Sequence, residues 1–183
     1  MCCKLTKLSI ICKLVIADSL AECGVYKVGL TGGEPLIRDD FLDIVSALSE
    51  REITIITIYT NGWLVDEKLL DELEERGQHP SFQLSYDGVG MHDFLRGVEG
   101  AEEKTIKAIK LLNKRGYSIS VSMCVHRKNM GVLRESVKLL ASLGVRSLKA
   151  GSMMQLGEWA QPEVADLQLT PQENFETIER YIP

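Results

Sequence analysis

The chain has 183 residues, of which 45% are hydrophobic and 26% are charged, a balance that is ordinary for a globular protein with one sizeable core. The net charge of −5 comes from interspersed acidic and basic residues, which gives no support for a nucleic-acid partner because nucleic-acid binding calls for a clustered basic face. No apolar stretch reaches the roughly 18 residues of a membrane span. The run from Leu8 to Ala17 is interrupted by Lys13 and lacks a cleavage site, so we expect a cytoplasmic protein without a signal peptide.

Strands alternate with helices along the whole chain. The expected strands are short β-branched or apolar runs, whereas the expected helices carry apolar residues three and four positions apart. In chain order, the predicted elements are a helix at about Leu8–Cys23, a strand at Val25–Leu30, a helix at Asp39–Arg51, a strand at Thr54–Tyr59, a helix capped by Asp66, a strand at Ser81–Tyr86, a helix at Ala101–Arg115, a strand at Ser118–Val125, a helix at Asn129–Leu143, a strand at Val145–Ala150 and a helix that starts at Thr170-Pro171. In the last two helices we expect these residues to face the core: Leu133, Val137, Leu140, Phe175 and Ile178.

Four glycines mark the ends of the predicted helices. Each stands just after a helix and just before a strand, where glycine takes the left-handed conformation that closes a helix: Gly24, Gly77, Gly116 and Gly144. Near the end of the chain, Thr170 and Glu173 enclose Pro171 in a capping box, which predicts the start of the last helix.

The spacing of the strands indicates a parallel sheet. The predicted strands begin 27 to 37 residues apart, which is the length that a strand, a crossover helix and two loops require. Crossovers of this kind join parallel strands and are right-handed. The fold class is therefore α/β, and we expect an α/β barrel or part of one. An open doubly wound sheet is the alternative.

Chemically unusual residues gather at the C-terminal ends of the strands, where parallel α/β folds bind ligands. These ends are Thr31 to Pro35, Thr60 to Gly62, Ser85 to Gly88, Val125 to Asn129 and Gly151 to Met154. In the segment from Thr31 to Pro35, two glycines let the backbone approach a ligand, and Glu34 can accept charge-assisted hydrogen bonds from a cation. The alternative is a tight strand-to-helix turn with a solvated Glu34.

Several of these segments are similar to one family. The run from Val28 to Val45 (VGLTGGEPLIRDDFLDIV) resembles the second-strand motif of radical S-adenosylmethionine enzymes. Thr60-Asn61-Gly62 resembles the end of the family's third strand, and Ser85 to Gly97 (SYDGVGMHDFLRG) resembles its fourth-strand segment. The resemblance runs from about Glu22 to Gly151. It implies a partial (β/α)6 barrel in residues 1–151 that lacks its first β/α unit, followed by a connecting segment and a C-terminal helix at 152–183.

The resemblance assigns roles to individual residues. Gly32, Gly33, Glu34 and Pro35 would form the segment that holds the amino group of S-adenosylmethionine. Ser85 and Asp87 would face the ribose hydroxyls, although Asp87-Gly88 is also a common turn pair. Asn61 would line the cofactor pocket or cap the turn with Gly62.

Weaker expectations concern four residues after the third and fourth predicted strands. Asn129 would contribute to the site or cap a helix, and His126 is expected at the surface more often than in catalysis. His92 and Arg96 belong to a recurrent stretch with a structural role.

The resemblance also implies a four-iron four-sulfur cluster, which a Cys-x-x-x-Cys-x-x-Cys loop would hold. The cluster would cleave S-adenosylmethionine to a 5′-deoxyadenosyl radical, which would abstract hydrogen from the substrate. The chain has five cysteines, Cys2, Cys3, Cys12, Cys23 and Cys124, and no three of them have this spacing. We therefore expect the chain to be truncated at its start, with the cluster ligands outside it. The segment from Gly151 resembles the passage to the cysteine-rich extension of the SPASM-type branch, which implies a peptide or protein substrate.

Two other functions compete with a radical enzyme core. A relative without a cluster would bind only a small molecule or a protein partner. An unrelated α/β enzyme would bind a phosphate at Gly32-Gly33, but the sequence lacks a P-loop and a Gly-x-Gly-x-x-Gly motif, and Glu34 would repel the anion.

Overall fold

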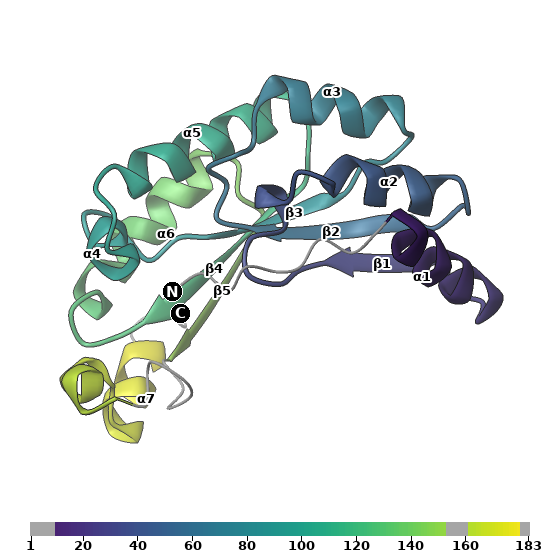
Figure 1. Ribbon diagram of the computed structural model, residues 1–183. Coiled ribbons are helices and arrows are strands. Elements are labelled where there is room, and N and C mark those ends of the chain that lie inside the picture. The colour runs from purple at the N-terminus through teal and green to yellow at the C-terminus, as the bar shows by residue number, and fades with distance from the viewer. Residues whose placement is uncertain (1–9, 153–160, 180–183) are drawn as a thin grey trace. The chain divides into compact units, whose positions relative to one another are not determined.

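The computed structural model describes residues 10–152 and 161–179, and the chain forms two compact units. Unit 1 comprises Met1–Thr60 and Leu64–Phe82, and unit 2 comprises Asn61–Trp63 and Gln83–Pro183. The strands follow the order β1-β2-β3-β4-β5 in one sheet (Figure 1). Helices alternate with these strands, and the first two and the last two strands pair in parallel, which confirms the predicted α/β class.

Unit 1 consists of parallel strands and the helices that connect them. Its elements are α1 (Ile10–Glu22), β1 (Lys27–Leu30), the 3₁₀ turn η1 (Pro35–Ile37), α2 (Phe41–Ser49), β2 (Thr54–Thr60), α3 (Glu67–Glu75) and the start of β3 (Ser81–Ser85). β1 pairs with β2 in parallel, with Lys27 opposite Thr54 and Leu30 opposite Ile58. A parallel pair needs a crossover connection, and α2 supplies it.

Unit 2 repeats the same plan. Its elements after β3 are α4 (His92–Arg96), α5 (Ala101–Lys114), β4 (Ile119–Val125), the 3₁₀ turn η2 (Met130–Val132), α6 (Leu133–Ser142), β5 (Ser147–Ser152), the 3₁₀ segment η4 (Pro162–Leu167) and α7 (Pro171–Glu179). β4 and β5 pair in parallel from Ser120 and Ser147 to Val125 and Ser152. The five strands were all predicted from the sequence, with boundaries displaced by at most two residues.

The core of each unit lies on one face of its strands. In β4, Val121 and Met123 are buried, whereas the alternating Ser120 and Ser122 are half-exposed. Side chains in a strand point alternately to opposite faces, so one face of β4 packs in the core and the other does not. The helices contribute the other half of the core: Val45 and Leu48 of α2, Leu70 and Leu73 of α3, and Ala108, Ile109 and Leu112 of α5.

The predicted helix ends are confirmed. The four glycines that follow helices have positive φ angles: 74° at Gly24, 70° at Gly77, 79° at Gly116 and 80° at Gly144. The capping box also forms, because the Glu173 backbone N–H donates to Thr170 Oγ1 at 3.2 Å and the Thr170 N–H donates to Glu173 Oε2 at 2.8 Å. These signals are local, which is why they could be predicted from neighbouring residues alone.

Two predicted core positions are wrong. Val137 is 41% exposed and Phe175 is 57% exposed. In α6 the buried stripe passes through Leu133, Ser136 and Leu140, so the predictions for Leu133 and Leu140 are confirmed. Among the α7 side chains that the structure describes, Thr177 is buried, and its hydroxyl donates to the Glu173 carbonyl at 2.6 Å. The side chain of Ile178 lies outside the described residues.

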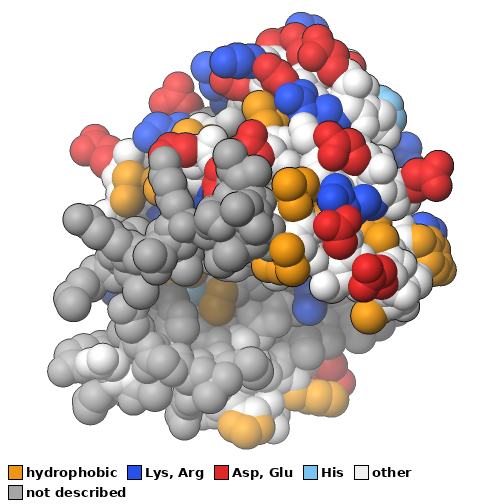
Figure 2. All heavy atoms as spheres, turned by 45° about the vertical axis from the view of Figure 1, so that its right-hand side comes forward, with side chains coloured by type: hydrophobic (Ala, Val, Ile, Leu, Met, Phe, Trp, Pro, Cys, Tyr) orange, Lys and Arg blue, Asp and Glu red, His pale blue; other side chains and the backbone are white. Residues whose placement is uncertain are grey.

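Acidic and basic side chains lie next to each other over the described part of the face in Figure 2. Within residues 10–152 and 161–179, no helix is both long enough and apolar enough to cross a membrane.

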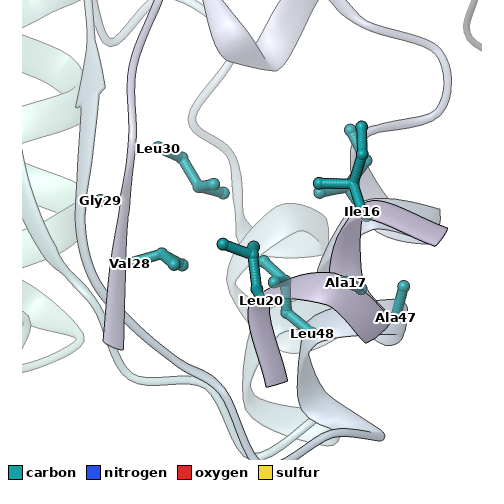
Figure 3. Close-up of a pocket in the computed structure, with 9 residues that line it drawn as sticks. Ile16, Ala17, Leu20, Val28, Gly29, Leu30, Ala47 and Leu48 are labelled. Carbon is teal, nitrogen blue, oxygen red and sulfur yellow. The ribbon is translucent and has the colours of Figure 1, made fainter. Parts of the chain in front are cut away.

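An apolar groove of about 280 Å³ runs beside β1 in unit 1. Figure 3 shows Val28 and Leu30 of β1 pointing toward Leu20 of α1. The groove is lined by Ile16, Ala17, Leu20, Val28, Gly29, Leu30, Ile44, Ala47 and Leu48. β1 is the first strand in the sheet order, so its outer edge pairs with no described strand. Unpaired edges beside apolar surface favour pairing with another chain.

We expect the isolated chain to self-associate through the β1 edge. Sedimentation velocity over a concentration series should show the mean mass rising with concentration. A lysine in place of Tyr26, which is 69% exposed directly before β1, should reduce the association because edge charges oppose strand pairing. A wild-type chain that sediments as a monomer at every concentration would contradict this prediction.

Candidate functional site

The turn after β1 leaves its backbone open. Gly32 has a φ of 148°, which a side chain rarely tolerates. A Cβ added at Gly32 or at Gly33 would meet no heavy atom within 4 Å. The two glycines therefore expose main-chain groups beside open space.

A pocket of about 460 Å³ adjoins this turn in unit 1. Its lining combines the turn with apolar side chains of η1 and α2: Leu30, Thr31, Gly32, Gly33, Glu34, Pro35, Ile37, Arg38, Phe41 and Ile44. The pocket has room for a small organic ligand, and Glu34 is the acidic group in its lining.

Two donors orient the carboxylate of Glu34. The Leu36 backbone N–H donates to Glu34 Oε1 at 3.2 Å, so Glu34 caps the 3₁₀ turn. The Thr60 hydroxyl donates to the same oxygen at 2.7 Å from the end of β2. Pro35 occupies the first position of η1 and is buried, which stiffens the exit of the turn.

An ion pair closes the loop between η1 and α2. Arg38 Nε and Nη2 contact the two carboxylate oxygens of Asp40 at 2.9 Å each, in the parallel fork that guanidinium groups form. Asp40 is 8% exposed. Arg38 lines the pocket, and its guanidinium is paired with Asp40.

Asn61 holds the turn after β2. Its Oδ1 accepts from the Trp63 N–H at 2.9 Å, while Gly62 between them has a φ of 84°. A Cβ on Gly62 would lie 2.7 Å from Leu84 Cδ2, so only glycine fits there. The turn-capping alternative for Asn61 is therefore present, and a ligand contact of Asn61 stays a prediction.

Asp87 is the most enclosed acidic group of unit 2. Its carboxylate has no exposed surface and contacts Arg96 Nη2 at 2.8 Å and His92 Nδ1 at 3.1 Å. Its other oxygen accepts from the Cys124 N–H at 3.1 Å. Burial opposes ionisation of Asp87, but the His92 hydrogen bond and the Arg96 charge outweigh it, so its pKa lies below the usual value. This arrangement favours the structural alternative for Asp87, and its ribose contact stays a prediction.

His92 links two strand ends within unit 2. It is fully buried, and its Nδ1 lies 3.0 Å from the Asp87 backbone nitrogen. Its Nε2 lies 3.2 Å from Thr105 Oγ1, and that hydroxyl donates to the Asn61 carbonyl at 3.2 Å. A buried, connected polar network of this kind rigidifies the loops that it joins. The structural role expected for His92 and Arg96 agrees with these contacts.

Ser85 and Tyr86 differ in accessibility at the end of β3. Ser85 is half-exposed as the last residue of the strand, whereas Tyr86 is buried. The Tyr86 hydroxyl donates to Glu102 Oε1 at 2.8 Å, and burial together with that carboxylate raises the pKa of Tyr86. Ser85 is therefore the accessible hydroxyl of this strand end.

Asn129 and His126 follow β4. Asn129 stands at the N-cap position of η2, but its amide donates to the carbonyls of Asp87 and Cys124 at 2.8 Å each and so clamps two strand ends. The sequence led us to expect His126 at the surface, but His126 is buried, and its backbone N–H donates to Asn129 Oδ1 at 2.7 Å. Among the described residues its Nε2 has no hydrogen-bond partner.

The described cysteines do not form a cluster site. Cys23 is exposed and Cys124 is half-buried, and no group of three potential metal ligands occurs in the described ranges. Burial raises the pKa of Cys124 to about 11, which disfavours the thiolate form. Cys2 and Cys3 lie outside the described residues.

Comparison with known proteins gives consistent matches. A sequence model of the radical SAM superfamily matches residues 14–148. The PqqA peptide cyclase of Granulibacter bethesdensis is 30% identical over 147 residues, which are 79% of this chain and 38% of that protein. The sporulation killing factor maturation protein SkfB of Bacillus subtilis is 28% identical over 145 residues, which are 79% of this chain and 35% of that protein. The chain thus spans less than two fifths of these two relatives.

The fold has solved counterparts. The crystal structure of Streptococcus suis SuiB matches with a TM-score of 0.76 at 17% identity and covers 97% of this chain and 40% of SuiB. SuiB structures bound to S-adenosylmethionine and to the precursor peptide SuiA match with TM-scores of 0.67 and 0.72, at 21% and 17% identity. At these identities the likeness shows the fold, and it confirms the predicted TIM-like arrangement of parallel strands.

Proposed function

Because the chain belongs to the radical SAM superfamily, we propose that it is the S-adenosylmethionine-binding core of an enzyme that abstracts hydrogen from its substrate. In this family a four-iron four-sulfur cluster supplies the electron that cleaves S-adenosylmethionine into methionine and a 5′-deoxyadenosyl radical. The residues of this chain bind and orient the cofactor.

The single observation that carries this proposal is the carboxylate of Glu34 at the pocket beside β1. Oε1 is held by Leu36 and Thr60, so the side chain is oriented before a ligand arrives. The methionine end of S-adenosylmethionine carries an ammonium group, which an oriented carboxylate and exposed main-chain carbonyls recognise through charge-assisted bonds. The open space at Gly32 and Gly33 lets the ligand approach the backbone.

For the ribose we keep Ser85 as the contact residue, because it is half-exposed at its strand end. Asp87 is buried, and Asn61 is bonded to its own turn, so both hold their loops, and their contacts with the cofactor stay predictions.

The cluster ligands are proposed to lie outside this chain, since the described residues offer no suitable group. That proposal predicts an in-frame Cys-x-x-x-Cys-x-x-Cys upstream of Met1 in the source DNA. A stop codon there, or a reading frame without the triplet, would count against it.

A peptide or protein is the substrate class that we propose. The relatives include a PqqA peptide cyclase and a killing-factor maturation protein, and SuiB has been solved with a precursor peptide.

A reducing, cytoplasmic setting suits the cysteine content, which matches no disulfide framework.

A relative without a cluster is the second candidate, favoured by the lack of a three-ligand group among the described residues. Ligand-observed NMR titration of the full chain with S-adenosylmethionine tests both functions. We expect weak binding without iron, because Glu34 contributes only part of the contacts. Tight binding without iron would favour the second candidate, and no binding would reject the proposed site.

Anaerobic reconstitution with iron and sulfide should leave this chain without a stable four-iron cluster, as judged by its absorption spectrum and its iron content. The physical reason is that the described residues offer no group of three potential metal ligands, and Cys124 is half-buried. A stoichiometric cluster would show that the ligands lie within this chain after all.

A further inference from the structure

A buried hydroxyl at the end of β2 holds the carboxylate proposed to bind the cofactor. Thr60 Oγ1 donates to Glu34 Oε1 at 2.7 Å, across 26 residues of sequence, and Thr60 is 5% exposed. From this geometry we infer that Thr60 is a positioning residue, which aims Glu34 at the ammonium group of S-adenosylmethionine. The inference rests on the proposed function and adds to it a residue that contacts no ligand itself.

The register of the sheet explains why Thr60 reaches Glu34. Leu30 pairs with Ile58 at the end of the β1–β2 ladder, so the chains that leave these two strands run side by side. Thr60 lies two residues beyond Ile58 and Glu34 lies four residues beyond Leu30. A β-branched side chain in a strand has few rotamers, so the backbone of β2 sets the direction of the hydroxyl.

Two donors from different elements meet at one carboxylate oxygen. Leu36 N–H approaches Oε1 from η1 at 3.2 Å, and the Thr60 hydroxyl approaches it from β2. A free glutamate samples many rotamers, and ordering it on binding costs affinity. The pair of donors removes part of that cost before the ligand arrives.

Replacing Thr60 with valine keeps the shape of the side chain and removes the hydroxyl. We expect Thr60→Val to weaken S-adenosylmethionine binding about tenfold, which corresponds to roughly 1.4 kcal/mol. Binding of 5′-methylthioadenosine, which lacks the ammonium and carboxylate groups, should not change. Thr60→Ser restores the donor and should restore the affinity.

A double-mutant cycle tests whether Thr60 acts through Glu34. In a Glu34→Gln background, Thr60→Val should change the affinity by less than about twofold, because the charged acceptor is already gone. Thr57→Val, on the same strand as Thr60, is the matched control. It removes the 2.8 Å hydroxyl contact to Ser81 of β3, and binding of both ligands should not change.

The outcomes separate the inference from the proposed function. Unchanged S-adenosylmethionine binding in Thr60→Val overturns the inference and leaves the proposed function standing. Equal losses for both ligands would assign Thr60 a general packing role and also overturn it. Failure of the wild-type chain to bind S-adenosylmethionine rejects both. If the valine variant does not fold, Thr60→Cys, with its weak S–H donor, takes its place in the same comparison.

Discussion

Replacing Glu34 with glutamine should weaken S-adenosylmethionine binding about 50-fold, since hydrogen bonds to charged groups contribute roughly 1.5–3 kcal/mol each. Glutamine keeps an oxygen for the Leu36 N–H and the Thr60 hydroxyl, so the turn should stay intact. The lost quantity is the negative charge that faces the ligand's ammonium group. NMR or calorimetric titration of the full chain measures the effect.

The control for this prediction is Glu75→Gln, which removes an exposed charge from the end of α3 in the same unit. It should bind S-adenosylmethionine like the wild type, and both variants should bind 5′-methylthioadenosine normally. Wild-type affinity in Glu34→Gln would mean that Glu34 only caps its turn, the alternative that the sequence left open.

Replacing Asp87 with asparagine should lower the free energy of unfolding by about 3 kcal/mol at neutral pH, the range for breaking a buried ion pair. The change leaves Arg96 without its counter-ion. It also places an amide group where the carboxylate now accepts hydrogen bonds, including that of the Cys124 N–H. Urea denaturation of both proteins at several pH values measures the difference.

The difference should depend on pH. Because the folded pKa of Asp87 is depressed, its contribution is present above the unfolded value of about 3.9 and is lost as the pH falls through the lower folded pKa. The difference in the free energy of unfolding between wild type and Asp87→Asn should therefore become smaller in acid. Glu103→Gln, an exposed change on α5, should stay within about 0.5 kcal/mol of wild type at every pH. If Asp87→Asn lowers the free energy of unfolding only slightly, or by an amount that does not vary with pH, the role assigned to the ion pair is contradicted.

Much of the fold was predictable from local patterns. Strand spacing indicated parallel crossovers, and the glycines after helices have the left-handed angles that helix ends require. These features depend on residues close together in the chain. Val137 and Phe175 were predicted to be buried and are exposed, because the periodicity shows which side of a helix is apolar but not what covers it.

The sequence indicated which loops would form the candidate site, but not which side chains in those loops would contact one another. The segment from Thr31 to Pro35 stood out by composition, and it lies within the residues that the family model matches. The role of Thr60 was missed, because nothing in a threonine beside Asn61 shows that its hydroxyl will meet a carboxylate 26 residues away. The resemblance covered Thr60-Asn61-Gly62, but the site role was assigned to Asn61 alone.

The sequence alone determined the family, the order of strands and helices, and the strand ends where ligand chemistry gathers, since all of these follow from spacing and short-range geometry. Only the tertiary structure decided which polar groups are accessible. It shows Asp87 sealed between Arg96 and His92, and Glu34 oriented at a pocket by a strand that follows it in the chain. Burial and long-range hydrogen bonds depend on how strands pair and helices pack, and no local pattern in the chain carries that information.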